Sequence, residues 1–103
     1  MNLSGLSASL VLRLDDEGEV EAMQVGYSWR SQFENVDIPP DFPKEKIPKY
    51  LQERIALVKL TPVNRVGSDR GVIGRKLSDS LYVVYLTYDE FKELKQLTQG
   101  ESK

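Results

Sequence analysis

The chain contains neither histidine nor cysteine among its 103 residues. Thiolate–imidazole pairs, serine–histidine triads and zinc sites with nitrogen or sulfur ligands are therefore excluded. Catalysis would have to use carboxylates, lysines, tyrosines or a serine–lysine pair. We expect a protein that is not an enzyme and that has no catalytic residues, no metal and no cofactor.

A group of carboxylates around Gly18 could in principle bind a hard cation such as calcium. Its members are Asp15, Asp16, Glu17, Glu19 and Glu21. If Gly18 were the glycine of an EF-hand loop, the first ligand position would fall on Arg13, so that motif is absent. Adjacent turn residues also cannot face each other across a glycosidase cleft. We interpret the group as the solvated tip of a hairpin.

A glycine-punctuated loop between residues 63 and 74 superficially resembles a phosphate cradle. A phosphate-binding loop needs a lysine directly after its last glycine and a helix next, whereas Gly74 is followed by Arg75 and then by an expected strand. What remains is a group of basic side chains that could contact nucleic-acid phosphates without reading bases. These are Arg65, Arg70, Arg75 and Lys76. The alternative is a surface connection whose arginines are simply hydrated.

Three aromatic residues, Tyr27, Trp29 and Phe33, lie close together in the sequence. Tyrosine and tryptophan are enriched among the residues that dominate binding energy at protein interfaces. We therefore take the three as candidate partner-binding residues. The alternative is that they are ordinary core, because alternate residues of one strand share a face.

The net charge of −2 hides a segregated charge distribution. Residues 1–43 hold two basic and eight acidic residues, whereas residues 44–78 hold nine basic and three acidic ones. Either the opposite charges of the two segments lie close together and offset each other, or the second segment forms a basic face that meets an acidic partner. The whole molecule has no strong attraction to nucleic acid or to an anionic membrane.

Two local signals at the N-terminal end predict a β-hairpin. Ser7–Leu14 alternates apolar and polar residues, and Val20–Trp29 places Met23 and Val25 on one face. The intervening Asp–Gly sequence is typical of a turn, so we expect a loop of four or five residues.

The middle of the chain is dominated by prolines. Pro39, Pro40 and Pro43 predict that residues 30–47 form an extended connector. A helix is expected from Pro48 to Leu60, because proline suits the first helical position and Pro62 ends the pattern. The loop that follows is expected to contain a short strand at Val72–Ile73.

The C-terminal part combines a strong strand pattern with a strong helix signal. Leu81–Leu86 is apolar at successive positions, which predicts a central strand covered on both sides. Thr87 and Glu90 have the spacing of a capping box, and a helical stripe of apolar residues follows until Gly100.

These elements predict an α+β fold: a small, mostly antiparallel sheet, made of the N-terminal hairpin and a central C-terminal strand, with two helices packed on one face. We expect one domain over residues 1–98 and a flexible tail at 99–103. The function expected is that of a non-enzymatic protein-binding domain, a small cytoplasmic inhibitor or adaptor, for example phage-encoded, acting on a larger protein partner. The alternative is a nucleic-acid-contacting protein that uses the basic region 44–76; no membrane association is expected, and the oligomeric state is open.

Overall fold

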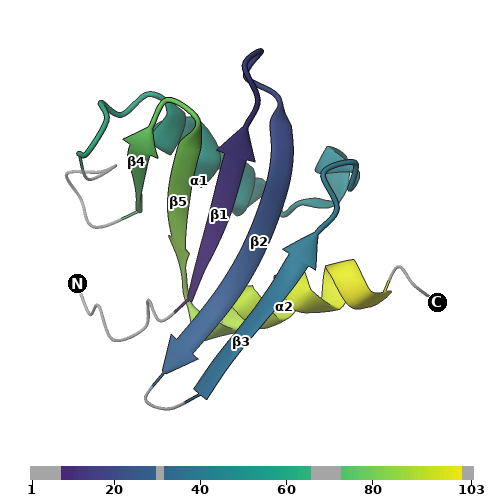
Figure 1. Ribbon diagram of the computed structural model, residues 1–103. Coiled ribbons are helices and arrows are strands. Elements are labelled where there is room, and N and C mark those ends of the chain that lie inside the picture. Colours follow the sequence, from purple (N-terminus) through teal and green to yellow (C-terminus); the bar gives the residue numbers. More distant parts are fainter. Residues whose placement is uncertain (1–7, 30–31, 66–72, 101–103) are drawn as a thin grey trace.

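A computed structural model describes residues 8–29, 32–65 and 73–100 of the chain (Figure 1). Three strands come first, followed by a short 3-10 helix and an α-helix, and then by two more strands and a second α-helix. In chain order the elements are β1 (Ala8–Leu14), β2 (Val20–Trp29), β3 (Gln32–Ile38), the 3-10 helix η2 (Lys44–Lys46), α1 (Lys49–Lys59), β4 (Gly74–Ser78), β5 (Leu81–Leu86) and α2 (Tyr88–Gly100).

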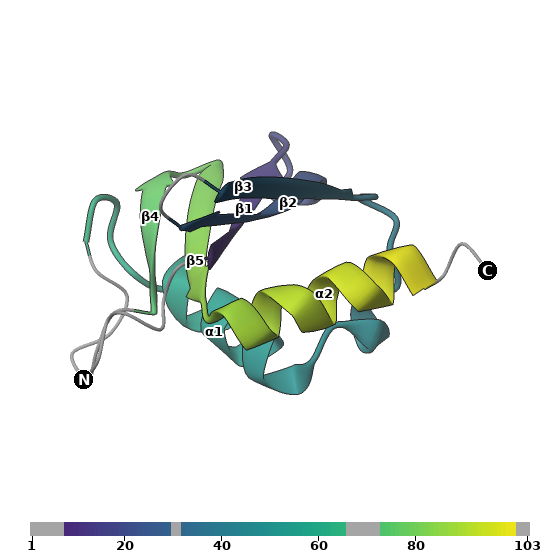
Figure 2. The same ribbon diagram turned by 90° about the horizontal axis from the view of Figure 1, so that it is seen from below.

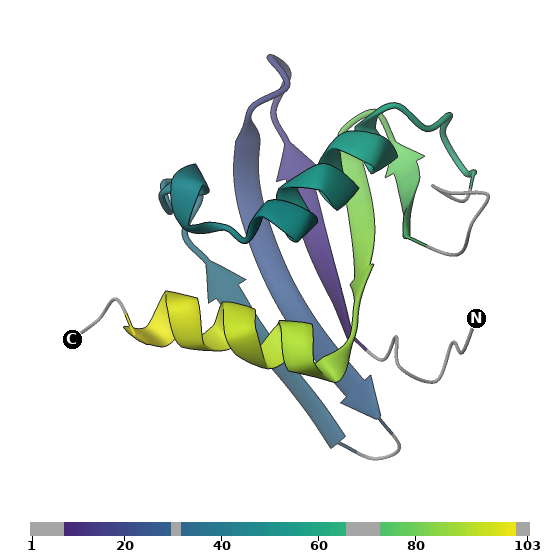
Figure 3. The same cartoon turned by 180° about the vertical axis from the view of Figure 1, so that it is seen from behind.

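The strands form one sheet in the order β3-β2-β1-β5-β4, and every neighbouring pair is antiparallel. Both α-helices pack on the same face of this sheet (Figures 2 and 3). The predicted fold class, an antiparallel sheet with two helices on one face, is therefore confirmed. The strand at the centre is β1, and β5 lies between β1 and the edge strand β4.

The predicted hairpin is confirmed. β1 pairs with β2 from Ala8 opposite Tyr27 to Leu14 opposite Val20. One carboxylate oxygen of Asp15 accepts hydrogen bonds of 2.9 Å from the backbone N–H groups of Glu17 and Glu19, which closes the turn. Gly18 adopts a φ of 84°, a conformation that glycine reaches without steric cost.

The prediction that residues 30–47 form only a connector is wrong, because Gln32–Ile38 pairs with β2 as an edge strand. Val36 and Ile38 lie on the helix side of this strand, and Glu34 pairs there with Lys95 of α2. The prolines act after the strand, not within it. An edge strand with one exposed face tolerates polar residues, so its pattern is weak in the sequence.

The short strand predicted at Val72–Ile73 is also displaced. Val72 lies outside the described residues, and β4 begins at Gly74. A β-carbon at position 74 would lie 2.3 Å from the carbonyl oxygen of Val83 and 2.7 Å from a methyl carbon of Val58. Glycine therefore allows β4 to approach both β5 and α1 closely.

Within the described residues, strand β5 is covered on one side only, contrary to the prediction that it is covered on both. Tyr82, Val84 and Leu86 are buried beneath the helices. The alternate residues Leu81, Val83 and Tyr85 are half-buried on the other side, where no described element packs over them (Figure 2).

The two α-helices match the local signals in the sequence. α1 follows Pro48 and buries Leu51 and Val58 completely. The capping box of α2 forms as predicted, because the Thr87 N–H donates to the Glu90 carboxylate at 2.9 Å and the Glu90 N–H donates to the Thr87 hydroxyl at 3.2 Å. α2 then buries Phe91 and Leu94 against the sheet.

Polar side chains tie α1 to α2. The Arg54 guanidinium donates two hydrogen bonds of 2.8 Å to the Glu90 carboxylate, and the Tyr50 hydroxyl donates one of 2.8 Å to Glu93. Because Glu90 also completes the α2 capping box, one carboxylate fixes both the start of α2 and its position relative to α1.

The C-terminal residues continue α2 further than the expected domain boundary. The helix extends to Gly100, and residues 101–103 of the predicted tail lie outside the described residues. No helix in the described part of the chain is long and apolar enough to span a bilayer.

Candidate functional site

The sheet face opposite the helices is the surface that the fold leaves uncovered in the described part of the chain (Figure 2). One row of side chains crosses all strands of the sheet on this face. From the β3 edge to the β4 edge it consists of Asp37, Gln24, Val11, Val83 and Arg75. With a strand spacing of about 4.8 Å, the row is about 19 Å long. We call this surface the open face.

The centre of the open face is apolar. Val11 and Val83 lie side by side in this row. Leu81 and Tyr85 lie in the two rows that flank it, one on each side. All four are half-buried, although no described element covers them. An apolar group of this kind on an otherwise polar surface is typical of a site that another molecule covers.

A shallow hollow of about 260 Å³ opens beside this apolar group. Val11, Ala22 and Leu81 contribute apolar walls, while Arg13 and Asp37 bring a charge of each sign. The small side chain of Ala22 stands beside the longer Arg13 in the register, which leaves the space. The Gln24 amide holds Asp37 in place with a hydrogen bond of 2.9 Å.

Charge is unevenly distributed over the open face. The outward positions of β1, β4 and β5 carry Arg13 and Arg75 but no carboxylate. Asp37 lies on the β3 part of this face, at the opposite edge from Arg75, and the exposed Glu21 lies at the bulge of β2 next to Ala22. The half of the face that holds the apolar group is therefore positively charged.

The three aromatic residues predicted to bind a partner do not share one face. Phe33 lies opposite Ser28 in the register, on the open face, and is 75% exposed. Tyr27 lies on the helix side, where its ring centroid is 4.5 Å from that of Tyr88 and 5.7 Å from that of Phe91. Trp29 pairs with Gln32 in the ladder, but its side chain lies outside the description.

The basic residues predicted to contact nucleic acid are also separated. Arg75 lies on the open face, whereas Lys76 lies on the helix side, 5.5 Å above the Tyr82 ring, and donates a hydrogen bond of 3.1 Å to the Lys59 carbonyl. Arg65 is exposed in the turn after α1, and Arg70 lies outside the described residues. In the described part of the chain, these side chains form no single basic patch.

The titratable groups between the helices have pKa values displaced away from neutrality. Burial alone would raise the pKa of Glu90, but hydrogen bonds from Arg54 and Thr87 outweigh it and lower that pKa below its ordinary value. Burial, and then the hydrogen bond and charge of Glu93, raise the pKa of the Tyr50 hydroxyl. A general acid or base works best with a pKa near the operating pH, so neither group is suited to that role at neutral pH.

The carboxylates of the hairpin tip do not assemble a cation site. Asp15 uses one oxygen to accept hydrogen bonds within the turn. Over residues 8–29, 32–65 and 73–100, no group of three or more potential ligands is arranged to hold a metal ion.

No known protein family, curated protein or solved structure matches this chain. The fold and the site together define a small α+β domain that presents one uncovered face of an antiparallel sheet. Sequence reasoning missed this face because it assigned a cover to both sides of β5. The signal that could have found it was Arg13 between the apolar residues Leu12 and Leu14, since a charged residue in a strand marks a face turned toward solvent.

Proposed function

We propose that the chain is a non-enzymatic protein-binding domain that binds a larger protein through the open face. The observation that carries the proposal is the half-buried apolar group of Val11, Leu81, Val83 and Tyr85 around a hollow, on a face without a covering element in the described residues. The open face is broad and its hollow is open to solvent, whereas a small-ligand site is concave and encloses most of its ligand. The open face suits the apolar centre and polar rim of a protein interface.

The charges of the open face define the chemistry of the partner. Arg13 and Arg75 flank the apolar group, so the complementary surface has an apolar side chain that enters the hollow and carboxylates placed toward these arginines. Charge complementarity of this kind sets the orientation and speeds the encounter. Exposed Phe33 extends the contact along β3.

The proposed role is that of a small accessory inhibitor or adaptor, for example one encoded by a phage, which acts by occupying a surface of its partner. We propose the cytoplasm as its location, because a cysteine-free domain is suited to a reducing compartment. No chemical step is assigned to the chain.

The test compares matched variants against one identified partner. The full chain is immobilised, a lysate of the native host is passed over it, and the retained protein is identified and purified. Its affinity is then measured for wild type, for Ala22→Tyr, which fills the hollow, and for Arg13→Glu. Lys49→Glu, on the exposed surface of α1, is the control for a change of charge away from the open face.

We expect Ala22→Tyr to weaken binding by about 30-fold or more, the size typical of a lost interface hot spot. Arg13→Glu should weaken it mainly through slower association, and Lys49→Glu should change it less than about threefold. A partner that binds the Ala22→Tyr variant as tightly as wild type contradicts the proposal.

Two further outcomes would show that the chain binds a different kind of partner. If nuclease treatment of the lysate removes all retained material, and binding to an oligonucleotide weakens steeply with salt, the nucleic-acid alternative is correct. If sedimentation shows a wild-type dimer that Ala22→Tyr converts to monomers, the face pairs two copies of the chain instead.

A further inference from the structure

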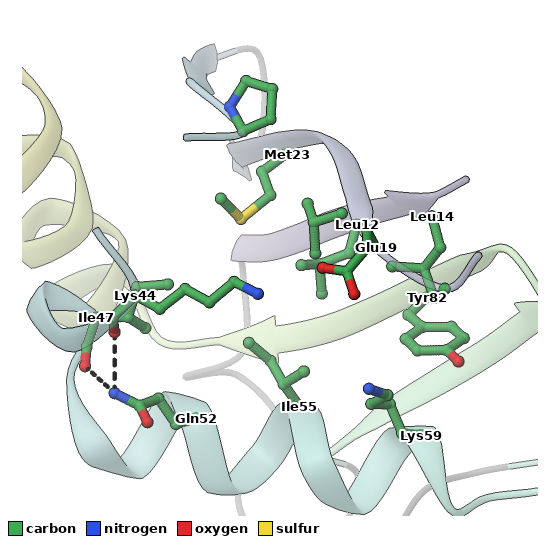
Figure 4. A pocket seen from close by; sticks show the side chains of 13 residues that line it. Leu12, Leu14, Glu19, Met23, Lys44, Ile47, Gln52, Ile55, Lys59 and Tyr82 are labelled. Atoms are coloured by element: carbon green, nitrogen blue, oxygen red, sulfur yellow. Dashed lines mark hydrogen bonds between the residues drawn. The ribbon is translucent and has the colours of Figure 1, made fainter. Parts of the chain in front are cut away.

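A cavity of about 240 Å³ lies on the helix side of the sheet, opposite to the open face (Figure 4). The hairpin, the segment around η2, α1 and β5 each contribute to its walls. Its apolar lining comes mainly from Leu12, Leu14, Val20, Met23, Ile55 and Tyr82. The cavity lies beneath the middle of α1. Ile55 lines it and is only half-buried, whereas Leu51 and Val58, nearer the two ends of the helix, are fully buried.

Two lysines project into this cavity from different elements. Lys44 extends from η2 and Lys59 from the last turn of α1, and Figure 4 shows both ammonium groups turned toward the cavity. In the residues described, neither ammonium group makes an ion pair. The carboxylate of Glu19 also faces the cavity, so the charged groups have a net charge of +1.

The segment that carries Lys44 is held against α1. The Gln52 amide donates hydrogen bonds of 3.1 Å to the Lys44 carbonyl and 2.7 Å to the Ile47 carbonyl. On the other side, Lys76 donates to the Lys59 carbonyl and lies over the Tyr82 ring, which brings a third positive charge close to the cavity wall. The backbone around both cationic groups is therefore positioned before any ligand arrives.

We propose that this cavity binds a small monocarboxylate with an apolar body about the size of a substituted benzene ring. An apolar protein cavity of about 150 Å³ accommodates benzene, so the larger cavity here has room for a ring with a short substituent. The two lysines supply the partners for a carboxylate. Glu19 disfavours a second negative charge, which selects against phosphate esters and dicarboxylates.

The site is independent of the proposed protein-binding function, because it lies on the other side of the sheet. For a ligand of about twelve heavy atoms held by flexible lysines, we expect a dissociation constant on the order of 0.1–1 mM. The Ala22→Tyr variant, which fills the hollow of the open face, should bind the carboxylate as wild type does. Failure of one proposal can thus be distinguished from failure of the other.

The experiment titrates 4-propylbenzoate into the full chain and follows backbone amide shifts by NMR, with the neutral 4-propylbenzamide as the matched probe. The test variant replaces both cavity lysines, Lys44→Met with Lys59→Met. The control variant replaces two exposed lysines that do not line the cavity, Lys49→Met with Lys92→Met. Val20→Phe, which adds volume at the cavity wall, tests the apolar part of the site.

We expect shifts concentrated on the cavity residues and affinity for the benzoate at least tenfold above that for the benzamide. The test variant should lose this tenfold preference, the control variant should keep it, and Val20→Phe should weaken both probes. The proposal is overturned if no shifts occur up to 10 mM, a concentration about tenfold above the expected range. It is also overturned if the benzamide binds as well as the benzoate, or if the control variant loses as much affinity as the test variant.

Discussion

Replacing Gly74 with alanine should reveal how closely the edge of the sheet is packed. Neither Gly74 nor Gly26 has a positive φ, so backbone conformation does not forbid a side chain at either position. The surroundings differ, however. A β-carbon at Gly74 would meet the Val83 carbonyl oxygen at 2.3 Å and the Val84 α-carbon at 3.0 Å, which are backbone atoms of β5.

The expected cost follows from what must move. Extra volume in a well-packed core typically costs 1–3 kcal/mol, and the upper end applies where the obstacle is backbone. Relieving this contact requires β4 to move away from β5 and from Val58 on α1. We therefore expect Gly74→Ala to lower the free energy of unfolding by about 3 kcal/mol, which corresponds to a fall in Tm of about 12–24 °C.

Gly26 provides the matched control within the same sheet. A β-carbon there would meet Oδ1 of Asn35 at 2.4 Å, but this atom ends an exposed side chain that can rotate away. Glycine inside a strand is less favourable than alanine by roughly 0.5–1 kcal/mol. Gly26→Ala should therefore leave stability unchanged or raise it by about 0.5 kcal/mol.

Urea unfolding followed by far-UV circular dichroism measures both changes on the same scale. We expect the denaturant midpoint of Gly74→Ala to fall well below that of wild type, and that of Gly26→Ala to stay equal or rise. A reduced m-value for Gly74→Ala would indicate that β4 has already detached in its native state. If Gly74→Ala lies within 0.5 kcal/mol of wild type, or if both glycine variants lose the same stability, the close approach of β4 to β5 is refuted.

Three further outcomes test other parts of the structure. Glu90→Gln should lower the free energy of unfolding by about 1–2 kcal/mol at pH 7. Because the pKa of Glu90 is lowered in the folded protein, its contribution to stability is present above the unfolded pKa of about 4.3 and is lost as pH falls further. Thermal melts of wild type and variant should therefore converge at acidic pH, and a difference that stays constant with pH would contradict this. Asp15→Ala removes the acceptor of two turn hydrogen bonds and should cost about 1 kcal/mol in urea unfolding, whereas an unchanged midpoint would mean that the turn does not depend on them. Phe33→Ser should change stability by less than about 0.5 kcal/mol, because the side chain is 75% exposed, and a larger loss would show that Phe33 is packed in solution.

Elements with short-range signals were predictable from the sequence. The hairpin was identified because Asp15 and Gly18 supply turn chemistry between two alternating segments, and the structure confirms both the turn and the pairing. The start of α2 was identified because Thr87 and Glu90 satisfy each other's backbone donors within four residues. In both cases the atoms that form the interaction are close in sequence, so tertiary context does not alter the outcome.

The two edge strands depend on long-range context instead. β3 alternates Val36 and Ile38 with polar residues, and this short pattern was outweighed by the prolines that follow it. β4 contains Arg75 and Lys76, which have no strand preference that could be read locally. Each becomes a strand because an inner strand offers it unpaired backbone groups, and that information lies elsewhere in the chain.

The open face could not be predicted for the same reason. Val11, Val83 and Arg75 belong to three segments, and only the register of β1, β5 and β4 places them in one row. The aromatic residues close in sequence were instead separated, since Tyr27 and Phe33 have opposite parity relative to the sheet. Proximity along the chain therefore does not identify which residues share a face of the sheet, whereas the pairing of the strands does. A binding surface on a sheet is specified by register, so a substitution such as Ala22→Tyr, which leaves the register intact and changes only the hollow, separates binding from folding.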